Sequence, residues 1–143
     1  MLEQYNSLQI IGVPLDLGAS RRGTDAGPMA LRVAGLRAAL RKMGYELALD
    51  VDISVPQRET QERPKDPHCS AHFKTEILQV CTDLADATYA ALQQGHFPLI
   101  TGGDHSVAMG SVSATSHFYR EKQQEIGLLW FDAHGDMNTP ESS

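Results

Sequence analysis

Two short stretches of the sequence gather side chains that bind metal ions. Residues 132–136 read Asp-Ala-His-Gly-Asp, and residues 102–105 read Gly-Gly-Asp-His. If the first stretch is extended, Asp132, His134 and Asp136 project to one side, because alternate residues of an extended chain share a face. Two carboxylates and an imidazole at one point repel and lose hydration unless a cation lies between them. The spacing therefore predicts a metal site.

The types of ligand narrow the choice of metal. Carboxylate oxygens combined with imidazole nitrogens suit Mn²⁺ and also accept Zn²⁺, Fe²⁺ or Co²⁺. No cysteine lies near residues 132–136, which argues against a structural zinc site. A carboxylate placed between the other ligands could bridge two ions, and a bridged pair turns the water between the ions into a hydroxide nucleophile.

The elements that position these residues follow from the hydrophobic pattern, in which short apolar runs alternate with longer segments of helical period. Runs that are apolar on both faces are typical of a parallel sheet covered by helices. We therefore expect one α/β domain over residues 1–143, with three layers: a mostly parallel sheet and helices on both faces. Ligands bind beyond the carboxyl ends of such strands, where both stretches lie. The expected strands are 8–13, 45–51, 97–101 and 126–131, and the expected helices are 28–43, 73–94 and 105–122.

Length and composition exclude several classes of protein. The chain has 143 residues, which is an ordinary size for one domain. Its net charge of −6 argues against a nucleic-acid or membrane surface, where clustered basic residues supply the affinity. The apolar runs are too short to span a bilayer, and no secretory signal is visible. The two cysteines, Cys69 and Cys81, make no disulfide framework, so we expect a cytoplasmic protein with reduced thiols.

Other charged groups receive structural interpretations. We expect Asp50 and Asp52 to be strand-end acids rather than metal ligands, and Arg21 and Arg22 to be solvated. The remaining histidines are expected on the surface; they are His68, His72, His96 and His117.

The two metal-binding stretches resemble the N-terminal metal motifs of the ureohydrolases, the superfamily of arginase, agmatinase and formiminoglutamase. The matching residues are Gly102-Gly103-Asp104-His105-Ser106 followed by residues 132–136. The continuation Met137-Asn138-Thr139-Pro140 resembles arginase rather than agmatinase. The opening, with Gly12-Val13-Pro14, Arg22-Gly23 and Gly27-Pro28, also resembles arginases. The similarity runs over essentially the whole chain.

The resemblance implies an arginase-like fold and a hydrolase that converts L-arginine and water to L-ornithine and urea, through a hydroxide that bridges two Mn²⁺ ions. It implies that Asp132 bridges the ions, with His105 and Asp136 on one ion and His134 on the other. It also implies an oligomer, a trimer or a hexamer, for the complete protein.

The resemblance also implies roles at the substrate. Asp136 and His134 would be catalytic, with Asp136 orienting the hydroxide. Asn138 would bind the α-carboxylate of L-arginine, and His134 would contact the substrate as well. Asp104 would hold a metal ligand in place.

One family feature has no counterpart in this sequence. A Ser-x-Asp-x-Asp motif, which carries two further ligand aspartates in ureohydrolases, is absent. Two divalent ions carry four positive charges, and the carboxylates of Asp132 and Asp136 neutralise only two of them. We therefore expect the chain to be the N-terminal half of an arginase-like domain, apparently truncated, with weak activity or none by itself.

Three other interpretations remain open. The first is another ureohydrolase: an agmatinase, a guanidinobutyrase or a formiminoglutamase. The second is an inactive fragment or a non-catalytic homologue with a role in assembly. The third, a binuclear metallophosphatase, is disfavoured because its Asp-x-His motif lies on the first strand.

Overall fold

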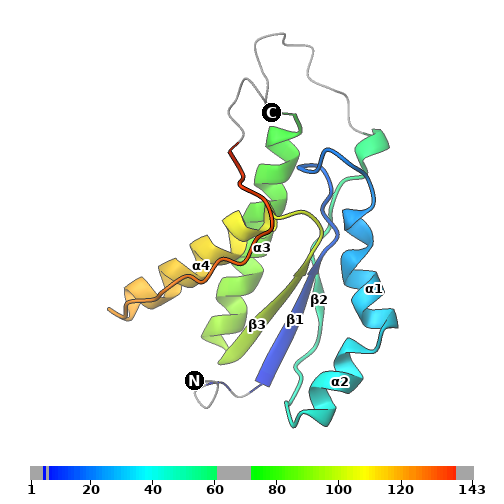
Figure 1. Ribbon diagram of the computed structural model, residues 1–143. Helices are drawn as coiled ribbons and strands as arrows, with labels where there is room; N and C mark the ends of the chain where they lie inside the picture. Colours follow the sequence, from blue (N-terminus) through cyan, green and yellow to red (C-terminus); the bar gives the residue numbers. More distant parts are fainter. Residues whose placement is uncertain (1–4, 6, 61–71, 138–143) are drawn as a thin grey trace.

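The sheet consists of three parallel strands. The computed structural model describes residue 5 and residues 7–60 and 72–137. Strand β1 (Ser7–Val13) lies between β2 (Val51–Asp52) and β3 (His96–Gly102). It pairs with β3 over its whole length, whereas it pairs with β2 at only two positions. The central strand is therefore β1, and β3 forms one edge of the described sheet (Figure 1).

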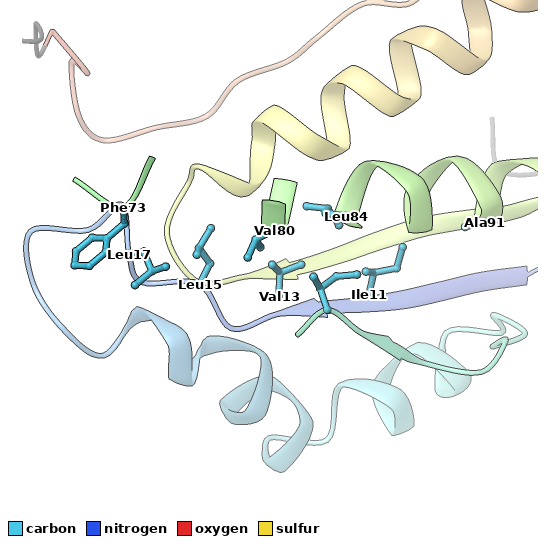
Figure 2. Close-up of a cluster of buried hydrophobic side chains, with 9 residues drawn as sticks. Ile11, Val13, Leu15, Leu17, Phe73, Val80, Leu84 and Ala91 are labelled. Atoms are coloured by element: carbon cyan, nitrogen blue, oxygen red, sulfur yellow. The ribbon is translucent and has the colours of Figure 1, made fainter. Parts of the chain in front are cut away.

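Helices cover both faces of this sheet. Helices α1 (Gly27–Val33) and α2 (Leu36–Lys42) lie on one side, and α3 (Lys74–Gln93) and α4 (Val107–Glu121) lie on the other (Figures 1 and 2). Two short 3₁₀ turns, η2 (Thr24–Ala26) and η3 (Arg58–Thr60), lie in the loops. In the part of the chain that the structure describes, no helix is long and apolar enough to cross a membrane. The predicted three-layer α/β fold is confirmed.

The main core lies between β1 and α3. Strand β1 contributes Ile11 and Val13, which are fully buried, and the chain beyond it contributes Leu15. From the opposite side, Val80 and Leu84 of α3 point toward the strands (Figure 2). Because these two positions are four apart, they share one face of the helix. The core cluster comprises Ile11, Val13, Leu15, Leu17, Ile53, Phe73, Val80, Leu84 and Ala91.

The two later helices agree with the sequence prediction, whereas the first does not. Helices α3 and α4 begin and end within two residues of the predicted bounds 73–94 and 105–122. The single helix predicted over 28–43 is wrong, because Gly35 has a φ of 88° and separates α1 from α2. A left-handed residue ends a helix, and glycine adopts that conformation without the strain that a Cβ causes.

Two of the predicted strands are also wrong. Over 45–51, only Val51 lies in a strand, and Leu47 forms an isolated bridge with Leu8. Residues 126–131 form no strand, and Leu129 and Phe131 are 83% and 93% exposed. A strand exists only where a neighbour pairs its backbone groups, and none of the described segments lies beside 126–131 in that way.

Candidate metal centre

The loops after β1 and β3 are joined at the edge of the sheet where the candidate ligands lie. The amide of Gly103 donates to the carbonyl of Val13 at 3.0 Å, and the amide of Asp104 donates to the carbonyl of Leu15 at 2.7 Å. A Cβ on Gly103 would lie 1.8 Å from the carbonyl oxygen of Leu15, so only glycine permits this approach. The close contact fixes where the chain leaves β3 and delivers His105.

The carboxylate of Asp104 holds the backbone around His105. Its Oδ2 accepts the amide of Gly18 at 2.9 Å, and its Oδ1 accepts the amide of Ser106 at 2.9 Å. Asp104 is 9% exposed, so these charge-assisted bonds replace the water that the carboxylate loses. The carboxylate thus fixes the backbone directly after His105 and ties it to the loop after β1.

Three of the predicted ligands meet at one point. Nδ1 of His105 lies 3.4 Å from Oδ2 of Asp132 and 3.5 Å from Oδ2 of Asp136. One ligand atom from each of the three residues lies within 4.8 Å of the others, and the described residues contain no second group of this kind. The structure therefore brings together the loop after β3 and the stretch 132–136, as the sequence predicted.

His134 lies on the other side of Asp132. Its Nδ1 is 3.1 Å from Oδ1 of Asp132, and it is not part of the three-residue group. The expectation of an extended stretch was wrong, because the chain bends at residues 133 and 134 and Asp136 has a φ of 47°. The two carboxylate oxygens of Asp132 consequently face two different imidazoles.

Hydrogen bonds keep the Asp132 carboxylate ionised. The backbone amide of His134 donates to Oδ1 at 2.9 Å, and this bond, followed by the side-chain contact with His105, lowers the pKa of Asp132 to about 2. Hydrogen bonds that favour the charged form lower the pKa of a carboxyl group. Asp132 is therefore a carboxylate at neutral pH and is available as a metal ligand.

The donor set suits a divalent cation. Atoms on neighbouring corners around an ion that binds at about 2.1 Å are about 3 Å apart, close to the 3.4 and 3.5 Å that separate Nδ1 of His105 from the two carboxylates. Carboxylate oxygen with imidazole nitrogen is a donor set that Mn²⁺ accepts. The side chains of His105 and Asp136 are exposed enough to adjust to an ion.

A groove opens beside these ligands. Its volume is about 1370 Å³, and Gly18, Arg21, Met109 and Asp132 are among the residues that line it. Cys81 also lines the groove, and its thiol donates to the carbonyl of Ser106 at 3.3 Å. Burial raises the pKa of the Cys81 thiol, so the group is protonated and unreactive at neutral pH. The groove gives a small molecule access to the candidate ligands.

Several charged residues outside the candidate centre form ion pairs. Asp50 pairs with Arg37 and Asp52 with Arg32, as expected for structural acids. Arg21 and Arg22 are exposed, as expected, and Arg22 also makes ion pairs. It pairs with Glu59 and lies 2.8 Å from Asp16, which is 4% exposed.

Sequence reasoning missed Asp16, although an acid directly beyond the first buried strand was a usable signal. It also missed Trp130, whose ring centroid lies 6.3 Å from that of His105. Five residues named from the sequence lie outside the described residues; they are His68, Cys69, Asn138, Thr139 and Pro140.

Comparison with known proteins places this chain in a family. The family model described as the arginase family matches residues 6–143. An arginase of Bacillus caldovelox is 38% identical over 136 residues, which are 95% of this chain and 44% of the relative. An arginase of Staphylococcus aureus (strain COL) is 37% identical over 142 residues, covering 99% of this chain and 45% of the relative. The chain thus spans less than half the length of these relatives.

Solved structures give the same result. The native structure of the Bacillus caldovelox arginase superposes with a TM-score of 0.80 at 36% identity, over 96% of this chain and 44% of that one. An Entamoeba histolytica arginase in complex with L-ornithine superposes with a TM-score of 0.79 at 26% identity, over 100% of this chain and 46% of that one. The family model, the sequence identities and the shared fold therefore show that this chain belongs to the arginase family.

Proposed function

We propose that this chain forms the N-terminal part of a hydrolase that converts L-arginine and water to L-ornithine and urea with two Mn²⁺ ions. The observation that carries the proposal is the position of Asp132 between two imidazoles. Its Oδ2 faces His105 and its Oδ1 faces His134. A carboxylate with a different histidine at each oxygen is suited to bridge two cations.

The other three candidate ligands fall into two sets around the carboxylate of Asp132. His105 and Asp136 share the side of Oδ2, and His134 alone shares the side of Oδ1. When bound, two divalent ions would supply Lewis-acid activation of a water molecule. Asp136 would accept a hydrogen bond from that water molecule and so orient the water. Asp104 would keep His105 in position.

The choice of L-arginine rests on the relatives and on the groove. Both curated relatives are named arginases, and the Entamoeba histolytica arginase was determined in complex with L-ornithine. The groove beside the ligands is open to a small molecule. We propose that Asn138, which follows the last ligand in the sequence, binds the α-carboxylate of the amino acid.

The test is a substrate comparison in two proteins. One is the 143-residue chain, and the other is a chimera in which the chain is followed by the part of the Bacillus caldovelox arginase beyond the match. Loaded with Mn²⁺, the chimera should release urea from L-arginine at least about tenfold faster than from agmatine, because agmatine lacks the charged group that Asn138 would bind. The 143-residue chain alone should release urea slowly or not at all, because it lacks the two ligand aspartates of the family motif.

A matched pair of variants makes the test specific. Asp132→Asn in the chimera should remove the activity, whereas Glu125→Gln, which changes an exposed acid seven residues earlier, should leave it unchanged. Faster turnover of agmatine or guanidinobutyrate than of L-arginine would instead identify another ureohydrolase. Equal activity of Asp132→Asn and the parent would contradict the proposed centre.

A further inference from the structure

We infer that Trp130 is a positioning residue for His105, whose imidazole it holds in the orientation of a metal ligand. The inference deepens the proposed function and rests on it, because it concerns how one proposed ligand is held before an ion binds. Trp130 precedes Asp132 by two residues. The indole group has an N–H donor but no ligand atom, so its role at the centre is exerted through a neighbouring side chain.

The imidazole of His105 contacts three side chains of one short stretch of the chain. Its ring centroid lies 6.3 Å from that of Trp130, and the two ring planes meet at 62° in an edge-to-face arrangement. Its Nδ1 lies 3.4 Å from Oδ2 of Asp132 and 3.5 Å from Oδ2 of Asp136. Aromatic rings attract one another in this geometry when their centroids are about 4.5–7 Å apart. The contact with Trp130 therefore favours one orientation of the imidazole.

Trp130 is less exposed than the residues on either side of it. Its exposed fraction is 50%, whereas those of Leu129 and Phe131 are 83% and 93%. Trp130 and Asp132 both reach the same imidazole, one with its ring and the other with its carboxylate. The segment that supplies a candidate ligand therefore also supplies an apolar contact for a second candidate ligand.

The contact with Trp130 differs from the two carboxylate contacts because it does not depend on whether an ion is present. The backbone of His105 is fixed at the start of α4, where its carbonyl accepts the amide of Ala108 at 2.9 Å, but its side chain is 57% exposed. With an ion bound, Asp132 and Asp136 would direct their oxygens to the ion instead of to Nδ1. The apolar contact remains, so Trp130 reduces the conformational entropy that His105 loses on becoming a ligand.

The first experiment measures the Mn²⁺ affinity of the 143-residue chain, with the free ion followed by electron paramagnetic resonance. Trp130→Leu should lower the affinity about two- to tenfold, which is the fold-change that corresponds to the loss of an aromatic pair. Trp130→Phe keeps an aromatic ring and should lose less affinity than Trp130→Leu. The control is Phe131→Leu, at the more exposed neighbouring residue, which should leave the affinity unchanged.

A double-mutant cycle shows whether Trp130 acts through His105. In a chain that already carries His105→Ala, Trp130→Leu should have no further effect on Mn²⁺ affinity, because the imidazole that it positions has been removed. An equal loss of affinity with and without His105 would contradict the inference, because Trp130 would then act on the centre by another route.

A measurement without metal tests the contact itself. Nuclear Overhauser effects should connect the ring protons of His105 and Trp130 in the metal-free chain, and Trp130 is the only tryptophan of the 143 residues. Their absence would overturn the inference. Equal Mn²⁺ affinity of Trp130→Leu and the parent would also overturn it, and would leave the proposed function intact. A parent chain that shows the ring contact but binds no Mn²⁺ would count against the proposed metal centre and so against this role.

Discussion

The amide of Gly18 donates a hydrogen bond of 2.9 Å to the carboxylate of Asp104, although 86 residues separate them in the sequence. The bond ties the loop after β1 to the loop that carries His105. The same carboxylate accepts the amide of Ser106, just before α4. The position of His105, the first candidate ligand, is therefore set by the loop after the central strand as well as by β3.

Asp104→Asn should weaken both the fold and the metal centre. The asparagine amide keeps one acceptor oxygen but turns an NH₂ group toward the other backbone N–H, which leaves buried donors without partners. We expect a loss of about 1–3 kcal/mol in the free energy of unfolding and a 10–100-fold loss in Mn²⁺ affinity. Urea unfolding and equilibrium dialysis measure the two effects.

The matched control for Asp104→Asn is Asp86→Asn, on the exposed face of α3. It should change neither quantity. If Asp104→Asn lowered stability while Mn²⁺ affinity stayed at the parent value, Asp104 would be a structural residue without a positioning role.

Gly103→Ala should destabilise the chain strongly. The added Cβ would lie 1.8 Å from the carbonyl oxygen of Leu15, and relief of the contact requires the loops after β1 and β3 to separate. Overpacking of this kind costs about 1–3 kcal/mol and can cost more. Gly127→Ala is the control, because its Cβ would meet nothing within 4 Å. Similar urea midpoints for the two variants would show that the loops are not closely packed.

The pKa of Asp132 should be near 2 rather than at its ordinary value of 3.8. Because the folded-state pKa is lowered, the stabilisation is present above the ordinary pKa and is lost as the pH falls through about 2. The carboxyl carbon shift of Asp132 in NMR spectra should hardly move between about pH 6 and about pH 4.

His105→Ala separates the causes of the low pKa of Asp132. It should raise that pKa only in part, because the backbone amide of His134, the larger cause, remains. A titration midpoint near 3.8 in the unmodified chain would refute the hydrogen-bond arrangement around Asp132.

The sequence predicted those parts of the fold that local patterns determine. Val80 and Leu84 recur at helical spacing, and α3 begins and ends close to its predicted bounds. The apolar pattern over 28–43 did not reveal the break at Gly35, because a glycine inside a helical pattern is compatible with either outcome. Residues 126–131 have the composition of a buried strand, but strand formation depends on a partner that local composition does not contain.

The candidate site was predictable in its members but not in its arrangement. His105, Asp132 and Asp136 meet as the sequence predicted, although residues 126–131, which were expected to deliver the two aspartates as a strand, form no strand. With the chain bent at residues 133 and 134, His134 contacts Oδ1 of Asp132, whereas His105 contacts Oδ2. That bend accompanies the hydrogen bond from the His134 amide to Asp132, and an alternation rule for extended chains does not anticipate such a bond.

The central claim is that Asp132 is the carboxylate around which Mn²⁺ binds. The most direct measurement is equilibrium dialysis of the 143-residue chain against Mn²⁺, with the bound metal determined by mass spectrometry, for the parent, Asp132→Asn and Glu125→Gln. Weak, readily removed Mn²⁺ is expected in the parent and in Glu125→Gln, and none above background in Asp132→Asn. Equal Mn²⁺ binding by Asp132→Asn and the parent would contradict this role of Asp132.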